Sequence, residues 1–165
     1  MRTRINGVLD LYLDSAKSDS NDGLSWATAC KSMGRLIEIL TDDYEYGRNG
    51  RPRINLAAGI QGNYDANGVV QPLYITAPLV GGGGNMAFLG GPIIEIVGNP
   101  ANPSACGWQA PPGPGNQGAA NIYNNHFYIH DLAIYGDAGP VGGSMAVQLH
   151  DRGCATLQNC YLRDF

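Results

Sequence analysis

Apolar and polar positions alternate in the same way in two segments near the end of the chain. Residues 129–135 and 157–163 both read apolar, any residue, Asp or Asn, apolar, any residue, apolar. Successive side chains of a strand point to opposite faces, so each segment is expected to bury one face. The two segments are 28 residues apart. Repeats of this length, made of short strands, are typical of solenoids, in which each coil buries its apolar face against its neighbours. The pattern therefore predicts stacked strands around a shared interior.

Further short apolar runs bounded by Gly, Asn or Pro predict the other strands of such a stack. The expected strands are residues 11–14, 53–57, 73–76, 93–97, 127–135, 146–150 and 155–162. The spacing of the early strands, roughly twenty residues, fits one turn of a three-sided coil or a part of one. A β-sandwich is the alternative, because short strands bounded by glycine also suit that fold.

One amphipathic helix is expected before these strands, from about Ala27 to Leu40. Its apolar stripe recurs at helical spacing and consists of Trp26, Cys30, Met33, Ile37 and Leu40. Ser25 or Thr28 can cap its first turn. A solenoid needs a cap over its exposed first coil. We therefore interpret this helix as an N-terminal plug.

Composition and charge narrow the class of protein. The chain has 24 glycines among 165 residues, 15% charged residues and 44% hydrophobic residues, which favours many turns around a real core over a helical bundle or a disordered chain. Its formal net charge of −4 and the lack of a basic run argue against nucleic-acid binding. We see neither a signal peptide nor an apolar stretch long enough for membrane insertion.

The four cysteines, Cys30, Cys106, Cys154 and Cys160, form no CxxC pair. We expect free thiols, with a Cys154–Cys160 disulfide as the alternative, and folding in a reducing compartment. Residues 18–23 look like a calcium loop but lack its ligand spacing, so we expect a turn. His126, His130 and His150 have no metal-ligand spacing, and no metal or other cofactor is expected.

The opening of the chain resembles a known protein family. A short strand at Leu11–Leu13, the loop Ser18–Ser25, a helix, and the run Ile54–Tyr64 are similar to the start of pectin-lyase-like proteins found in bacteriophage tail spikes and tail fibres. The resemblance implies an all-β fold, a right-handed parallel β-helix (solenoid) with an N-terminal capping α-helix. It implies fold more strongly than function, because this fold carries lyases, hydrolases, adhesins and inert spikes.

We accordingly divide the chain into three parts. Residues 1–10 are an N-terminal arm, residues 11–51 are the capping strand, loop and helix, and residues 52–165 are the first coils of a β-helix. This β-helix either continues in a longer protein or has its open end covered by partners. A Pro- and Gly-rich stretch, residues 100–125, is expected to be a long loop. It either folds onto the wall of the solenoid or contacts a subunit or ligand.

Candidate catalytic residues are few. Cleavage of a polysaccharide needs paired carboxyl groups, or a base together with a cation. Weak candidates are Asp131, Asp151 and Asp164, together with Glu95, Arg152 and Arg163. Asp131 and Asn159 occupy equivalent positions of the repeat, so Asp131 is expected to face an amide and not a second acid. Such polar side chains more often satisfy turn backbone groups, and we identify no catalytic constellation.

The leading functional hypothesis is a structural protein of a bacteriophage virion, part of a tail spike or tail fibre. The resemblance implies a homotrimer that contacts other virion proteins, is assembled in the host cytoplasm, and binds cell-surface polysaccharide. Any cleaving site would then lie beyond Phe165. The alternatives are a polysaccharide lyase or glycoside hydrolase of the same fold, and an extracellular adhesin or carbohydrate-binding module with a secretion signal.

Overall fold

Parallel strands make up most of the structure, a computed structural model that describes residues 1–71, 73–75, 93–111, 118–123, 125–136, 145–150 and 153–163. The strands are β1 (Thr3–Ile5), β2 (Val8–Leu13), β3 (Tyr44–Tyr46), β4 (Arg51–Leu56), β5 (Gly59–Gln61), β6 (Tyr74–Ile75), β7 (Ile93–Val97), β8 (Cys106–Gln109), β9 (Gly118–Tyr123), β10 (His126–His130), β11 (Ala133–Tyr135), β12 (Met145–His150), β13 (Cys154–Gln158) and β14 (Tyr161–Arg163). One α-helix, α1 (Met33–Asp42), and one short 3₁₀ helix, Pro103–Ala105, accompany them in this part of the chain.

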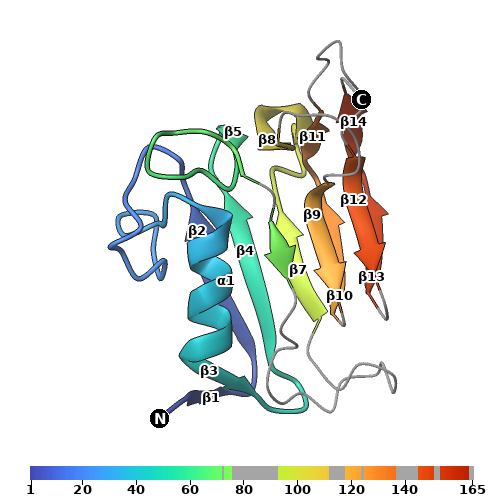
Figure 1. The fold of residues 1–165 in the computed structure, drawn as a ribbon. Coiled ribbons are helices and arrows are strands. Elements are labelled where there is room, and N and C mark those ends of the chain that lie inside the picture. Colours follow the sequence, from blue (N-terminus) through green and yellow to red (C-terminus); the bar gives the residue numbers. More distant parts are fainter. Residues whose placement is uncertain are drawn as a thin grey trace.

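The strands form four sheets, and every strand pairing within these sheets is parallel. The largest sheet has the order β13-β10-β7-β4-β2, the second β14-β11-β8-β5, and the third β12-β9-β6, while β1 pairs with β3. In Figure 1 the five-stranded sheet runs across the molecule in chain order, from blue β2 to red β13. Each step along a sheet therefore moves toward the C-terminal end of the chain.

The core follows from the register of the five-stranded sheet. Aligned along one row are Leu11, Ile54, Ile96, Ile129 and Leu157. The first four are completely buried, which is what alternation in a half-buried strand predicts. Leu157 lies on the last strand of this sheet and is 39% exposed. Every strand of the sheet thus places an apolar side chain on the interior face, but the side chain is completely buried only where another strand follows in the sheet.

The predicted fold class is contradicted by this architecture. The chain is not an all-β, right-handed parallel β-helix with a capping helix: its described residues form separate sheets of two, five, four and three strands together with an α-helix, and we find no solenoid among them. The physical reason lies in the connections. Helix α1 and strand β3 are inserted between β2 and β4, whereas β10 and β13 are joined by a much shorter stretch. The 28-residue spacing holds at the last step alone, where Ile129 pairs with Leu157 and Ala133 with Tyr161.

The predicted start of the helix is also wrong. Helix α1 begins at Met33, with Ser32 as its N-cap accepting a hydrogen bond from the Arg35 backbone N–H. Ser25 and Thr28 instead close a separate turn, in which the Thr28 backbone N–H donates to the Ser25 hydroxyl. The buried face of the helix consists of Met33, Leu36, Ile37, Ile39 and Leu40. The helix packs against β2 and β3, on the β2 side of the sheet in Figure 1.

The stripe predicted for that helix therefore loses its first two members. Trp26 lies outside the helix and is 47% exposed, and Cys30 forms an isolated parallel bridge with Leu13. The preceding loop is the turn that the sequence predicts. The Asp19 carboxylate accepts from both the backbone N–H and the hydroxyl of Ser32, and the Asp22 carboxylate accepts from Thr28. These acids anchor the entry to α1.

Two predicted long strands are each divided by a left-handed residue. Asp131, at φ 59°, separates β10 from β11, and Asn159, at φ 50°, separates β13 from β14. Asn and Asp tolerate this conformation better than other side chains with a Cβ. The two corners lie in equivalent positions of neighbouring strands, as the sequence predicts. Each corner carries the chain from the five-stranded sheet to the four-stranded sheet.

Two segments predicted to be irregular contain strands. The expected loop 100–125 includes β8 and β9, and its Trp108 is completely buried. Proline is confined to positions outside these strands, which explains why a proline-rich stretch still contributes to two sheets. The expected N-terminal arm forms β1 and the start of β2.

The four cysteines are free, as predicted, and Cys30 and Cys106 are buried. Burial raises the pKa of the Cys30 thiol to about 11. It also raises the pKa of Cys106.

Candidate functional site

Charged and polar side chains gather on the outward face of the five-stranded sheet. Because alternate residues of a strand share one face, the parallel register aligns them in rows. One row consists of Asp10, Arg53, Glu95, Tyr128 and Thr156. The next row consists of Tyr12, Asn55, Val97, His130 and Gln158. We call the connected set Arg51, Arg53, Glu95, His130 and Asp131 the charged cluster.

Glu95, on the central strand β7, is the hub of the charged cluster. Its side chain is 8% exposed, and its Oε1 lies 3.2 Å from Arg53 Nε and 3.1 Å from His130 Nε2. Its Oε2 lies 3.2 Å from Arg51 Nε. Burial raises the pKa of Glu95, but His130 and the two guanidinium groups outweigh burial, so its pKa lies below the ordinary value. The carboxylate is thus held ionised by three neighbours that carry or can carry positive charge.

His130 connects this hub to the corner between the sheets. Its Nδ1 lies 2.7 Å from Asp131 Oδ2, while its Nε2 faces Glu95. Both hydrogen bonds form together when both ring nitrogens carry a proton, because a carboxylate only accepts. The ring also stacks on Tyr128, with centroids 4.4 Å apart. His130 is therefore fixed on both edges and on one face.

Asp131 faces an amide, as the sequence predicts. The Asn159 side-chain nitrogen donates to Asp131 Oδ1 at 2.6 Å. This bond, together with the contact with His130, holds the pKa of Asp131 below its ordinary value. The two left-handed corners are thus joined by a hydrogen bond between the side chains that define them.

The cluster is better suited to holding strands together than to proton transfer. A general base or acid is most effective when its pKa lies near the working pH. The pKa values of Glu95 and Asp131 are instead lowered, and their carboxylates are engaged by neighbouring side chains. The ion pairs and hydrogen bonds join β4, β7 and β10 across the sheet. Asn55 extends this network to β2 through Asp10.

Two further polar residues from the sequence analysis that the structure describes, Arg163 and His126, lie outside the cluster. Arg163 lies over the Tyr161 ring, 5.9 Å from its centroid, on β14. His126 Nε2 lies 3.4 Å from the Thr156 hydroxyl, and burial lowers the pKa of His126. Asp151, Arg152 and Asp164 lie outside the described residues, as does the side chain of His150.

Sequence reasoning missed the two arginines of the cluster. Arg51 and Arg53 alternate with Pro52 and Ile54 on β4, so both were placed on the outward face by the same period of two that identified the core. Their pairing with Glu95 depends on the register between β4 and β7, and no local pattern contains it. The described residues hold no group of three or more His, Cys, Asp or Glu side chains suited to a metal ion.

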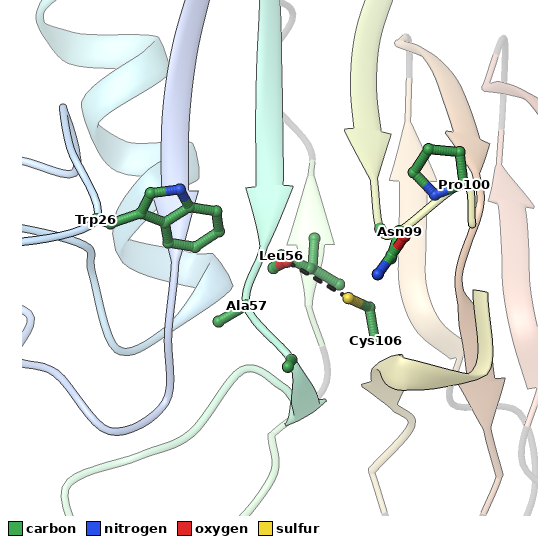
Figure 2. Close-up of a pocket in the computed structure, with 8 residues that line it drawn as sticks. Trp26, Leu56, Ala57, Asn99, Pro100 and Cys106 are labelled. Carbon is green, nitrogen blue, oxygen red and sulfur yellow. Dashed lines mark hydrogen bonds between the residues drawn. The ribbon is translucent and has the colours of Figure 1, made fainter. Parts of the chain in front are cut away.

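A pocket of about 490 Å³ lies where the loop before α1 meets the ends of β4 and β7. Figure 2 shows Trp26 on one side of it, Asn99 and Pro100 on the other, and Leu56, Ala57 and Cys106 between them. Ala58 and Gly98 complete its lining. A smaller pocket of about 190 Å³, which includes Arg35, Asp22 and Asp43, lies beside the helix.

The chain matches no protein-family model, no curated protein and no solved structure. Across the described parts of the chain, no helix has the length and apolarity that crossing a bilayer requires. Evidence on function therefore comes from the residues and their arrangement.

Proposed function

We propose that the chain is a structural part of a bacteriophage tail spike or tail fibre, which joins other chains of the particle and supports binding of host cell-surface polysaccharide. The observation that carries the proposal is the set of last strands, β12, β13 and β14. Each ends one of the three larger sheets and exposes an apolar side chain at a position that is buried one strand earlier. We call these three strands the open edge.

The register makes the contrast specific. Leu149 pairs with Ile122, Leu157 with Ile129, and Leu162 with Ile134. The three isoleucines are completely buried, whereas the three leucines are 50%, 39% and 55% exposed. Parallel strands with unpaired backbone groups and exposed apolar side chains readily accept a further strand. Either a further segment of the same protein or a neighbouring polypeptide of an assembly can supply such a strand, and both favour a structural role.

A particle assay tests the proposal directly. Mass spectrometry of purified phage particles from the source of the sequence should detect peptides of this chain in a constant ratio to the major tail proteins, with a copy number divisible by three if the chain forms homotrimers. Purified particles that contain no peptides of this chain would overturn the virion assignment. Secretion from an uninfected cell would instead favour an adhesin.

Hydrogen exchange separates the role of the open edge from simple association. The backbone amides of β13 and β14 that point away from β10 and β11 should exchange quickly in the isolated chain and slowly in the assembled particle, because a covering strand supplies their hydrogen-bond partners. Amides of β7 and β10 are the matched control, since they are paired on both sides in either state. Equal exchange of β13 and β14 in both samples would contradict the proposed assembly contact.

A polysaccharide lyase or glycoside hydrolase is the second candidate. One observation favours it: the charged cluster brings two carboxylates, two guanidinium groups and an imidazole to one face of a sheet. A lyase needs a base and a cation near a uronate. The variants Asp131→Asn and Asp151→Asn, assayed for cleavage of pectin and capsular polysaccharide, test this candidate. Activity lost in either variant and retained in Asp14→Asn would support an enzyme, and unchanged activity would remove both residues.

A further inference from the structure

The pocket beside Trp26 has a composition that points to an uncharged ligand. The side chains lining it are Trp26, Leu56, Ala57, Ala58, Asn99, Pro100 and Cys106, with Gly98. None carries a charge at neutral pH, although the charged cluster lies on the same sheet. Its volume of about 490 Å³ lies in the range of pockets that hold small organic ligands.

Trp26 forms an aromatic platform at one side of the pocket. It remains 47% exposed although it is the largest side chain available to the core from this loop. Its ring meets the ring of Tyr12 edge to face, with centroids 4.7 Å apart and planes at 61°. This contact fixes the orientation of the indole. An exposed, oriented indole can stack against a flat group that carries C–H bonds on its face.

Small residues keep the floor of the pocket wide. Three of the lining residues, Ala57, Ala58 and Gly98, have little or no side chain to fill the space. The Cys106 thiol donates to the Leu56 carbonyl, drawn as the dashed line in Figure 2, so this polar group is satisfied within the protein. The carbonyls of Ala57 and Ala58 accept from the Gln61 side chain.

Asn99 supplies a polar group opposite the platform. Its Oδ1 accepts from the backbone N–H groups of Ala101 and Asn102, which fixes the amide. In Figure 2 its nitrogen is directed toward Leu56 and Cys106, across the pocket. The amide nitrogen can therefore donate to a ligand while the oxygen stays engaged in the turn.

We infer that this pocket binds a neutral hexopyranose unit, with the C–H face of the sugar ring on Trp26 and a hydroxyl group accepting from Asn99. A pyranose has one apolar face and hydroxyl groups around its rim, which matches an uncharged pocket with one aromatic wall and one oriented donor. The inference rests on the proposed function, because the sugar would belong to the cell-surface polysaccharide. It adds the location of the contact and the neutral chemistry of the sugar.

Titration of the full chain with maltose, cellobiose and lactose, followed by NMR of the two indole N–H signals, tests the inference. Trp26 and Trp108 are the two tryptophans of the chain, and Trp108 is completely buried. We expect the Trp26 signal to shift in a saturable way with at least one of these disaccharides, while the Trp108 signal stays in place. No shift with any of the three would overturn the inference.

Two variants make the result specific. Isothermal titration calorimetry measures binding by the variants, because Trp26→Ala and Trp26→Phe lack the Trp26 indole signal. Trp26→Ala should weaken binding at least tenfold, and Trp26→Phe should retain part of it. Asn99→Asp keeps the acceptor oxygen of the turn but removes the amide donor, and it should also weaken binding about tenfold. The Trp108 signal reports whether each variant stays folded. Binding that is equal in Trp26→Ala and wild type would place the sugar elsewhere and contradict the pocket.

The particle assay separates this result from the proposed function. A chain that is present in particles and binds the disaccharide outside the pocket retains its proposed function and loses this inference. A chain that is absent from particles but binds at Trp26 loses the virion role and retains a sugar pocket.

Discussion

The middle of the sheets and the open edge repeat the same sequence pattern in different surroundings. Ile129 on β10 has a strand on either side and is completely buried, whereas Leu157, at the equivalent position of β13, has a neighbour on one side and is 39% exposed. The polar corners differ in the same way, since Asp131 is half-buried and Asn159 is exposed. Residue type and spacing therefore define which face a side chain occupies, and the next strand decides how much that position contributes to stability.

The largest expected difference in stability is between the truncation of Ile129, in the middle of the sheet, and that of Leu157, at the open edge. Ile129→Ala should lower the free energy of unfolding by about 2 to 5 kcal/mol, because it leaves a cavity among completely buried side chains. Leu157→Ala should cost less than about 1 kcal/mol in the isolated chain, since water already reaches this side chain. Urea unfolding of both variants measures the difference. Equal losses would mean that the open edge is covered in solution.

Glu95→Gln tests the outward face of the middle strands. Removing this charge leaves Arg51, Arg53 and His130 without their shared carboxylate, although the arginines remain partly exposed to water. We expect a loss of about 1 to 3 kcal/mol. Thr156→Val on the last strand is the matched control, and should change stability by less than about 0.5 kcal/mol. Urea unfolding at neutral pH measures both variants.

The same residue predicts a dependence on pH. The folded-state pKa of Glu95 is lowered below its ordinary value of 4.5, so its contribution is present above that value and is lost as the pH falls through the folded pKa. Asp131 acts in the same direction. Thermal unfolding of the wild type between neutral pH and pH values below 4.5 should show a fall in stability that is smaller in Glu95→Gln. An identical fall in both proteins would assign the acid sensitivity to other carboxyl groups.

The corner at the open edge should show a smaller effect, which two substitutions can divide. Asn159→Ala loses the hydrogen bond to Asp131 and places a Cβ without a compensating amide at φ 50°, with an expected cost of about 1 to 2 kcal/mol. Asn159→Gly loses the same hydrogen bond but adopts the backbone freely. It should be more stable than the alanine variant by about 1 kcal/mol. Chemical denaturation of both variants would reveal equal stabilities if backbone conformation had no part in the effect.

The smallest expected effect is at Leu162. Leu162→Ser should change the stability of the isolated chain by less than about 0.5 kcal/mol, because this side chain is 55% exposed. It should nevertheless reduce incorporation into particles if the open edge contacts another chain. Val69→Ser, at a position that is 48% exposed but lies away from the edge, is the control for incorporation. Normal incorporation of Leu162→Ser would weaken the assembly proposal.

Local patterns in the sequence predicted faces, corners and turns well. The pairing of Ile129 with Leu157, the contact between Asp131 and Asn159, and the free thiols were all predictable from alternation and spacing. These features depend on neighbours in the chain or on one repeat length. Strands β8 and β9, in the Pro-rich stretch, were missed because a proline can lie just outside a strand as well as in a segment that has no strand.

Features that depend on tertiary neighbours were not predictable in this way. The helix begins at Met33 and not at Ala27, because Asp19 reaches Ser32 from a distant part of the loop and makes it the cap. The charged cluster depends on the register between β4, β7 and β10, and Glu95 was considered without its arginines. The fold class failed for the same reason, since a repeat observed at one step was extended over connections of different length.

The buried thiols make the chain a reporter of its own opening. Cys30 has a pKa of about 11 and no exposed surface, so at neutral pH it exists as a shielded thiol and reacts poorly with alkylating reagents. The Cys30 backbone, three residues before the start of α1, forms an isolated parallel β-bridge with Leu13. Separation of α1 from β2 should therefore expose the Cys30 thiol to solvent. The rate at which Cys30 is alkylated therefore measures how often the N-terminal part of the molecule opens locally, and no cysteine has to be introduced for the experiment.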